Sequence, residues 1–413
     1  MTATSTCCRA CRAPLTHTFA DLGLSPISNA FVKQEDAKRG EMFYPLHALV
    51  CDRCWLVQLA DVARAETHFH DDYAYFSSYS SSWLAHARRY VEAMIPRFGL
   101  NAASRVVEIA SNDGYLLQYF VQAGIPCLGV EPTANTAAAA RKIGVESREL
   151  FFGRDTAAQL AAEGGLVDLL LGNNVLAHVP DINDFIGGMP FLLKPEGVIT
   201  LEFPHLLNLI AQNQFDTLYH EHYSYLSLTA LMPLFKHAGL RVFDVEHLPT
   251  HGGSLRVYAC HRRAKHCASD AVAACLDQEN VAGLLHLPTY TAFGEKVRET
   301  KRALLEFLID AKRKGARIAA YGAAAKGNTL LNYCGVGTDF IDYVVDKSPV
   351  KQGRLLPGTR IPVRAPQTVF DNKPDYLLIL PWNIKDEVMQ QMAGIRDWGG
   401  RFVLPIPTVE VMQ

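Results

Sequence analysis

The chain has 413 residues, of which 49% are apolar, and its net charge at pH 7 is −2. This length predicts roughly two or three domains with sizeable cores. The near-neutral charge argues against a general attraction to nucleic acid or anionic membranes. No apolar run approaches the ~20 residues that span a bilayer, and the first residues lack a signal-peptide core. We therefore expect a cytoplasmic protein whose ten cysteines are thiols or metal ligands rather than disulfides.

The N-terminal region contains two C-x2-C pairs that supply four cysteines. Their members are Cys8, Cys11, Cys51 and Cys54. Four thiolates form the tetrahedral set that structural zinc prefers, so we predict a closed Zn2+ site and a lobe formed by the residues between the pairs. Cys7 is an alternative ligand to Cys8. A nucleic-acid-binding finger is a rival interpretation, which the charge disfavours because phosphate contacts need clustered Lys and Arg.

Residues 71–83 alternate aromatic and hydroxyl side chains without the period of a strand or a helix. Two interpretations remain open for this stretch. It is either a hydrogen-bonded linker between domains or a lid whose tyrosines face a polar ligand. The tyrosines concerned are Tyr73, Tyr75 and Tyr79.

From residue 105 onward, strand-like and helix-like segments alternate. We expect strands at 105–110, 127–131, 167–174 and 197–204, helices at 115–123, 133–143 and 182–193, and a terminal hairpin of 240–247 with 254–261. This alternation predicts an α/β fold with a doubly wound parallel sheet. Loops that leave the carboxyl ends of the strands in such a sheet line the ligand crevice.

The turn after the first strand indicates which ligand the sheet binds. Gly114 is its single glycine, so the turn has neither the G-x-G-x-x-G of a dinucleotide fold nor the Gly-Lys-Ser/Thr ending of a phosphate loop. A nucleoside without phosphate fits better, and we predict S-adenosylmethionine (SAM). The cofactor candidates in and before the turn are Glu108, Ser111, Asn112, Asp113 and Gly114. Asp113 is equally consistent with capping the helix at 115–123.

Two later strands end in further candidates for SAM contact. Glu131 closes the second strand and is predicted to accept hydrogen bonds from both ribose hydroxyls. The alternative is that its charge serves the next helix N-terminus. Asn173 and Asn174 end a later strand, where the methionyl group would pass, although they are also suited to capping the following helix.

The segment 219–225 crowds two imidazoles, one carboxylate and three phenols into seven residues. Groups that titrate near neutral pH in a ligand crevice suit proton abstraction. A metal site made by His220 and His222 is disfavoured, because alternate residues of an extended loop point apart. We expect His220 to pack or to bond to backbone.

Residues 264–313 read as largely helical, and a strand, a glycine turn, a helix and an acid-ended strand then recur between 316 and 346. This order parallels residues 105–131 and predicts a second, Rossmann-like domain with strands at 375–380 and 401–404. Polar groups at its turns suit phosphate binding, although most lysines are solvated surface charges. The candidates for substrate contact are Lys326, Asn328, Lys347 and Lys351, together with His251 and Arg256 from a glycine turn nearby.

Four motifs and the paired cysteines together resemble the nucleotide-sugar C-methyltransferases of deoxysugar biosynthesis. The motifs lie at 108–115, 129–132, 174–181 and 219–222. That family joins a zinc-binding domain, a SAM-binding domain and a C-terminal domain in the order seen here. We place these domains at 1–70, 71–262 and 263–413. The first motif usually has Gly where this chain has Ala110, and we expect no loss of binding from the alanine.

The resemblance implies methylation at C-3 of an NDP-4-keto-6-deoxy sugar. A sugar carbon becomes nucleophilic once a proton beside the ketone is removed, so the reaction needs a base, a donor for the enolate oxygen and a dry pocket. The family pattern makes His222 the base and places Tyr219 and Glu221 in the same site, where Glu221 either orients the imidazole or binds substrate. A second family tyrosine matches Tyr73 or Tyr75 in preference to Tyr79. His178 is interpreted as structural.

Other classes of function remain as alternatives. Methylation of another carbon, or of an oxygen, is the alternative reaction, and a zinc-bearing nucleic-acid-binding module is the alternative without catalysis. An oxidoreductase is disfavoured by the missing glycine signature. We expect a small-molecule nucleotide sugar as the partner, no nucleic acid and no membrane, and a monomer with a separate core in each of three domains.

Overall fold

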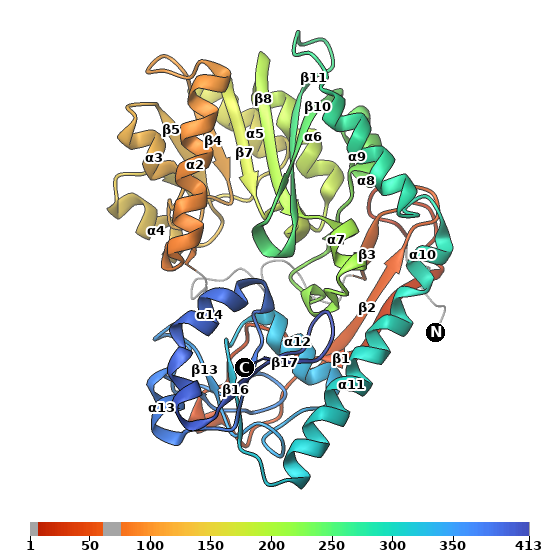
Figure 1. Cartoon of the computed structure of the whole chain (residues 1–413). Helices are drawn as coiled ribbons and strands as arrows, with labels where there is room; N and C mark the ends of the chain where they lie inside the picture. The colour runs from red at the N-terminus through yellow and green to blue at the C-terminus, as the bar shows by residue number, and fades with distance from the viewer. Residues whose placement is uncertain (1–6, 61–75, 413) are drawn as a thin grey trace.

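The computed structural model describes residues 7–60 and 76–412, which form three β-sheets (Figure 1). The strand orders are β1-β2-β3-β9, β10-β11-β8-β7-β4-β5-β6 and β14-β13-β12-β15-β16-β17. The second and third sheets carry helices, so the expected α/β class with two Rossmann-like units is confirmed. No helix among these described residues is both long and apolar enough to cross a bilayer.

The N-terminal lobe is built on the antiparallel four-stranded sheet. Its strands are β1 (His17–Ser25), β2 (Tyr44–Val50), β3 (Val57–Leu59) and β9 (Ser224–Tyr225), with the short helix η1 (Gln34–Asp36) between β1 and β2. The fourth strand comes from the segment 219–225, which the sequence predicts as an active-site loop. This part of the loop is therefore a strand of the N-terminal lobe.

The central sheet is parallel over five strands and ends in an antiparallel hairpin. Its strands are β4 (Val106–Ile109), β5 (Cys127–Val130), β6 (Ser147–Arg148), β7 (Val167–Asn173), β8 (Leu193–Pro204), β10 (Leu240–Leu248) and β11 (Ser254–His261). Its helical segments are η2 (Ser77–Tyr79), α2 (Ser81–Phe98), α3 (Leu117–Gln122), α4 (Ala134–Lys142), α5 (Arg154–Gly164), η3 (Leu176–His178), α6 (Ile182–Leu192), α7 (Leu206–Ala211), η4 (Phe215–Thr217), α8 (Leu228–His237) and η5 (Thr250–Gly252). The predicted strands, helices and hairpin are all present, with shifted ends.

Local sequence explains why α2 begins and ends where it does. The Ser80 hydroxyl accepts a hydrogen bond from the Trp83 N–H at 3.2 Å, and Gly99 ends the helix in the left-handed conformation. Residues three and four positions apart form its buried face, which is typical of a helix covering a sheet. These residues are Trp83, His86, Ala87, Tyr90, Val91 and Met94. The helix therefore brings its first turn to the carboxyl ends of the central strands.

The C-terminal unit repeats the strand–turn–helix order. Its strands are β12 (Ile318–Tyr321), β13 (Val344–Val345), β14 (Val363–Arg364), β15 (Tyr376–Ile379), β16 (Arg401–Leu404) and β17 (Glu410–Met412). Its helical segments are α12 (Ala325–Cys334), α13 (Gln367–Asn372), η6 (Trp382–Ile384), α14 (Lys385–Gln391) and η7 (Ala393–Trp398), preceded by α9 (Asp270–Val281), α10 (Leu287–Thr291) and α11 (Phe293–Arg313). The predicted helical stretch thus becomes three helices, and the predicted 340–346 strand is shorter because its first residues form a turn.

The N-terminal lobe shares its core with both other units. One cluster of buried side chains joins β1 and β2 to α11 and the C-terminal sheet, and within it Phe19 stacks on Phe293 with ring centroids 4.5 Å apart. A second cluster joins Cys8 and Cys51 to the central sheet. Figure 1 shows α11 running beside β1 and β2. The expectation of three separate cores is wrong, because buried side chains of the lobe pack in the same clusters as those of the two larger units.

Candidate active site

The turn after β4 has an unusual backbone. Ala110, Asn112 and Gly114 all have positive φ angles, of 56°, 51° and 77°. A Cβ on Gly114 would lie 3.1 Å from the Val145 side chain. Both the positive φ and this close approach therefore favour glycine at position 114. The left-handed conformation at Ala110 costs about 1–2 kcal/mol for a residue with a Cβ. The glycine that the family usually has at position 110 therefore has a conformational explanation.

Glu131 holds this turn in place. Its carboxylate accepts hydrogen bonds from the backbone N–H groups of Asn112, at 2.9 Å, and Thr133, at 3.0 Å. Burial raises its pKa, and these hydrogen bonds partly oppose that shift. Glu131 thus joins the first turn to the start of α4, and its contact with the ribose stays a prediction.

Several buried polar atoms at the carboxyl ends of β4 and β7 have no hydrogen-bonding partner in the described structure. They are Ser111 Oγ, Asp113 Oδ1, and both amide atoms of Asn173. Nearby, burial raises the pKa of Glu108 well above its usual value, and the Tyr115 hydroxyl opposes that shift. Because unpaired buried polar atoms are rare and costly, this cluster fits a polar ligand, and its place in the fold fits SAM.

The alternative capping roles of Asp113 and Asn174 are not those seen, whereas Glu131 does bond to the start of α4. Asp113 Oδ2 accepts a hydrogen bond from the Ser78 N–H at 3.2 Å, whereas α3 begins without a side-chain cap. Asn174 bonds through Nδ2 to His251 at 2.9 Å, and Asp181 is the residue that caps α6. The predicted SAM residues therefore connect the crevice to η2 and to the β10–β11 turn.

Arg256 is buried and forms ion pairs within the central unit. Its guanidinium donates to Glu202 and to Glu246, each at 2.9 Å, and it is 4% exposed. His86 donates to the same Glu202 oxygen at 2.9 Å. Although burial acts to raise the pKa of Glu202, these partners lower it overall. We therefore correct the predicted substrate contact of Arg256, because its charge is neutralised within the fold.

His222 lies buried in a fixed orientation. Its Nδ1–H donates to the Thr217 carbonyl at 3.0 Å, which leaves the lone pair on Nε2. Its ring centroid is 4.0 Å from that of Tyr219 and 4.6 Å from that of His178. Burial, followed by the nearby charge of His178, holds its pKa well below the usual value. The imidazole is thus neutral at pH 7, and Thr217 rather than Glu221 orients it.

The N-terminal lobe holds the residues around His222. Asn29 Nδ2 donates to Glu221 Oε1 at 2.7 Å, and His220 Nε2 donates to the Pro45 carbonyl at 3.2 Å. Burial raises the pKa of Glu221 to about 7. His220 has the backbone partner expected for it.

The C-terminal unit reaches the same site through α12. Lys326 Nζ donates to Asn383 Oδ1 at 3.0 Å and lies 4.6 Å above the Trp382 ring. Burial lowers its pKa, and its charge depresses the pKa of His222 and of His251, which falls to about 4 chiefly through burial. Lys326 is therefore within electrostatic range of both histidines.

Other polar groups complete the junction between the units. Trp382 Nε1 donates to the buried Asp216 at 2.7 Å, and burial raises the pKa of that carboxyl to about 6. Asn328, in the first turn of α12, is 1% exposed, and neither of its amide atoms has a partner in the described structure. Sequence reasoning missed Asn29, Asp216 and Trp382, because their partners are all distant in the chain.

The two remaining lysine candidates have partners within the fold. Lys347 is exposed and pairs with Glu387 at 3.4 Å on the surface. Lys351 donates to the Ala323 carbonyl at 2.9 Å and lies 3.5 Å from Asp346. The surface interpretation therefore holds for Lys347, and Lys351 closes the turn after β12.

The tyrosine candidates divide between the surface and the undescribed segment. Tyr79 is 65% exposed and stacks on Phe76 with ring centroids 5.4 Å apart, and its contact with substrate stays a prediction. Tyr73 and Tyr75 lie outside the described residues. Their predicted place in the site stays a prediction.

The four predicted zinc ligands converge. The Sγ atoms of Cys8 and Cys54, and those of Cys11 and Cys51, are 3.5 Å apart, and all four lie within 4.8 Å of one another. A tetrahedral site with Zn–S bonds of about 2.3 Å separates its sulfurs by about 3.8 Å, so the cluster fits zinc. Cys7 is exposed and outside the cluster. Cys8 is therefore the ligand.

A second group of ligating side chains has another role. His205, Cys275 and Glu279 lie together in the core. Glu279 accepts hydrogen bonds from His205 at 2.6 Å and from the backbone N–H groups of Leu228 and Thr229 at 2.7 Å each. Its carboxylate is thus engaged at the start of α8, and we assign the group to packing of α9 rather than to a metal.

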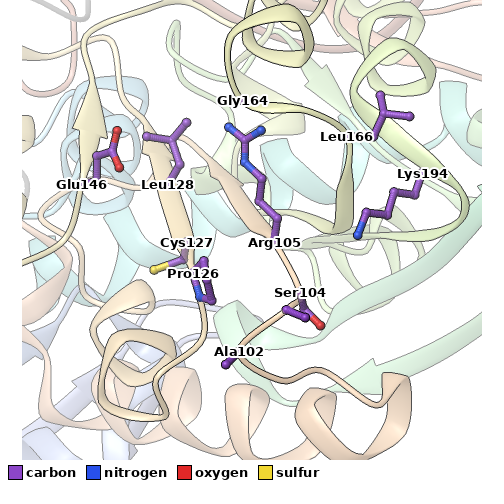
Figure 2. Close-up of a pocket in the computed structure, with 11 residues that line it drawn as sticks. Ala102, Ser104, Arg105, Pro126, Cys127, Leu128, Glu146, Gly164, Leu166 and Lys194 are labelled. Atoms are coloured by element: carbon purple, nitrogen blue, oxygen red, sulfur yellow. The ribbon is translucent and has the colours of Figure 1, made fainter.

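A surface cavity of about 400 Å³ lies at the amino ends of β4, β5 and β7 (Figure 2). Arg105 and Lys194 project toward it, but Arg105 donates to the Gly165 carbonyl and Lys194 pairs with Asp168. Ligands of doubly wound sheets bind at the carboxyl ends. The cavity is therefore distinct from the site around His222.

Comparison with known proteins assigns the class. Three family models match in order: a zinc binding domain at 8–69, a methyltransferase domain at 83–245 and a C-methyltransferase C-terminal domain at 249–407. Together with the fold and the cysteine cluster, these matches define a SAM-dependent C-methyltransferase with a structural zinc site.

Individual relatives narrow this assignment. The C-methyltransferase NovU of Streptomyces niveus is 37% identical over 406 residues, which cover 98% of this chain and 96% of NovU. The chain therefore belongs to the C-methyltransferase family that includes NovU. A ubiquinone biosynthesis O-methyltransferase of Rhodopseudomonas palustris is 30% identical over 100 residues, 24% of this chain and 40% of that enzyme. A SAM-dependent methyltransferase structure from Anabaena variabilis covers 44% of this chain and 87% of its own at 17% identity, and its TM-score of 0.36 supports no further conclusion.

Proposed function

We propose that the protein transfers a methyl group to C-3 of an NDP-4-keto-6-deoxy sugar. The observation that carries this proposal is the environment of His222, a buried neutral imidazole whose Nε2 lone pair is left free by the Nδ1–Thr217 hydrogen bond. A carbon nucleophile has to be generated by proton removal, and a neutral histidine is suited to that task. Methylation of an oxygen that already carries lone pairs has less need of such a base.

The proposed reaction divides the work among residues of this chain. His222 Nε2 removes the C-3 proton of the sugar, and the electrons of that C–H bond form the enolate of the 4-ketone. SAM supplies the electrophilic methyl group, which the enolate carbon attacks while the sulfur–methyl bond breaks. Tyr219, whose ring lies tilted against that of His222, is the proposed hydrogen-bond donor to the enolate oxygen. The burial of His222 and Glu221 supports a pocket that excludes water.

The proposed place for the nucleotide is the start of α12. This helix N-terminus has no side-chain cap, so its backbone N–H groups are suited to an anion. Lys326 supplies a buried ammonium group, and Asn328 supplies the buried amide without a partner. A pyrophosphate there would place an attached sugar toward His222, because the charge of Lys326 already acts on that imidazole.

Mass spectrometry of reactions with SAM and a panel of NDP-4-keto-6-deoxy sugars tests the proposal. We expect the gain of one methyl group on carbon. In deuterated water without SAM, the C-3 hydrogen should exchange with solvent, because the enolate forms before methylation. Methylation on oxygen, or exchange at another carbon alone, would contradict the assignment of C-3.

A further inference from the structure

Glu221 is held by a residue that lies far from it in the chain. Asn29 follows β1 in the N-terminal lobe, and its amide donates to Glu221 Oε1 at 2.7 Å. Glu221 is 4% exposed, and among the described residues Asn29 is its one hydrogen-bond donor. The orientation of this buried carboxylate therefore depends on a side chain outside the catalytic loop.

The loop that carries Asn29 is itself fixed on two sides. Next to it, Val32 and Leu355 exchange backbone hydrogen bonds of 3.0 and 2.8 Å with each other, which ties the loop to the C-terminal unit. On the other side, β1 belongs to the sheet that contains β9. Asn29 thus sits where the lobe, the C-terminal unit and the catalytic loop meet.

The zinc site supports the same arrangement. Gln58 on β3 donates to Cys8 Sγ at 3.2 Å and accepts from the Arg9 N–H at 2.8 Å, while its backbone pairs with Ser224 of β9. The Leu59 N–H donates to the Tyr223 carbonyl at 3.0 Å. One rigid strand therefore links the thiolate cluster to the residues that follow His222.

We propose that Asn29 is a positioning residue for methyl transfer, which fixes the carboxylate of Glu221 in the orientation and ionised form that the reaction needs. This inference rests on the proposed function, because that function places Glu221 in the catalytic loop. The free oxygen, Oε2, is then available to substrate. Asn29 acts through Glu221 and touches no ligand.

The electrostatics around Glu221 give this role a signature. Burial raises its pKa to about 7, and the Asn29 hydrogen bond lowers it. The other titratable groups on its own loop are Tyr219, His220, His222, Tyr223 and Tyr225, and Tyr44 of β2 packs against His220. None of them is among the causes of the shift. Removing the Asn29 donor should therefore raise the pKa of Glu221 further.

The test compares Asn29→Ala and the isosteric Asn29→Asp with wild type, with Asn280→Ala as a matched control on the exposed face of α9. On a sugar nucleotide that wild type converts, we expect kcat to fall about 10-fold or more, since a hydrogen bond to a charged group is lost. KM and SAM affinity should stay within about twofold, and the acidic limb of kcat should move to higher pH. The control should match wild type.

A double-mutant cycle decides whether Asn29 acts through Glu221. Adding Asn29→Ala to Glu221→Gln should leave kcat, and the melting temperature at pH 8, close to those of Glu221→Gln alone. Equal losses in both backgrounds, or an unmoved acidic limb in both Asn29 variants, would overturn the inference. The melting cycle needs no substrate. If wild type converts no sugar nucleotide, the proposed function fails while the melting cycle still decides the role of Asn29.

Discussion

The two Rossmann-like units begin the turn after their first strand with the same backbone hydrogen bond. The Ala110 N–H donates to the Val130 carbonyl at 2.7 Å, and the Gly322 N–H donates to the Val345 carbonyl at the same distance. Both residues have positive φ. The central unit thus has alanine where the C-terminal unit keeps the glycine that this backbone favours.

An acid at the end of the next strand fastens each turn. Glu131 accepts the N–H groups of Asn112 and Thr133, and Asp346 accepts those of Ala323 and Ser348 at 2.8 Å each. The two acids therefore do the same structural work. Their surroundings differ, because Asp346 pairs with a lysine.

Lys351 is the difference. It lies 3.5 Å from Asp346 and donates to the Ala323 carbonyl, so a side chain of the protein occupies the C-terminal turn. Among the described residues no lysine or arginine forms an ion pair with Glu131, and unpaired polar atoms surround it. The acid of the central unit is therefore left for SAM, whereas Lys351 pairs with the acid of the C-terminal unit and leaves the N–H groups at the start of α12 for the proposed pyrophosphate.

The largest expected effect tests whether His222 supplies the chemistry while the C-terminal unit binds the nucleotide. His222→Ala should lower kcat by about 100- to 10,000-fold, the range typical of a lost general base. SAM affinity should stay within about twofold. Steady-state kinetics and calorimetry measure both quantities.

Lys326→Ala is the matched variant in the C-terminal unit. It should raise KM for the sugar nucleotide more than it lowers kcat, because uniform binding is lost. This division of roles is wrong if Lys326→Ala lowers kcat as much as His222→Ala.

A buried acid without a capping role should make stability depend on pH. Burial raises the pKa of Glu221 from 4.5 to about 7, so the folded state favours the protonated carboxyl. This contribution is complete below pH 4.5 and is lost as pH rises toward 7. The free energy of unfolding of Glu221→Gln, relative to that of wild type, should therefore increase by about 3 kcal/mol as the pH rises from 5 to 8. Urea unfolding at both values measures the gain, and a difference independent of pH would contradict it.

The two capping acids should separate in their effect on SAM. Glu131→Gln should weaken SAM binding by about 10-fold, through loss of charge-assisted hydrogen bonds in the turn. Asp346→Asn removes the same kind of contact from the other unit and should leave SAM affinity unchanged. Isothermal titration calorimetry compares them, and equal weakening would show that the C-terminal turn also binds SAM.

The smallest effect concerns the residue at the start of each turn. Ala110→Gly should stabilise the protein by about 1 kcal/mol, because it relieves the left-handed conformation. Gly322→Ala should destabilise it, since a Cβ there would lie 2.5 Å from the Pro381 ring. Thermal unfolding measures both. The strain argument fails if Ala110→Gly lowers the melting temperature.

Features that depend on short stretches of sequence are predicted well. Apolar runs identify the central strands, and two C-x2-C pairs identify the zinc ligands, because thiolate spacing reflects a short-range geometry. The side chains of the loop at 219–225, its place after a strand and the family resemblance together predict a site there. Its joining of the lobe sheet was not predicted, since the pairing of the two-residue strand Ser224–Tyr225 depends on β3, far away in the chain.

The basic residues predicted to bind substrate show the same dependence on how the chain folds. Arg256 and Lys351 were predicted to bind substrate because they follow turns. A sequence does not show that Glu202 and Asp346 neutralise them, since these pairings follow from strand register and turn geometry. The Asn29 side chain carried no signal either, because its partner Glu221 lies 192 residues away in the chain.

The pairing of β3 with β9 limits how members of this family can be recombined. A chimaera that takes residues 8–60 from a relative would receive its own zinc cluster and β3, but it would meet a foreign β9. The exchangeable module is therefore discontinuous: residues 8–60 together with 219–225. A chimaera with a single junction before the central unit would take the strands of one sheet from two different parent proteins.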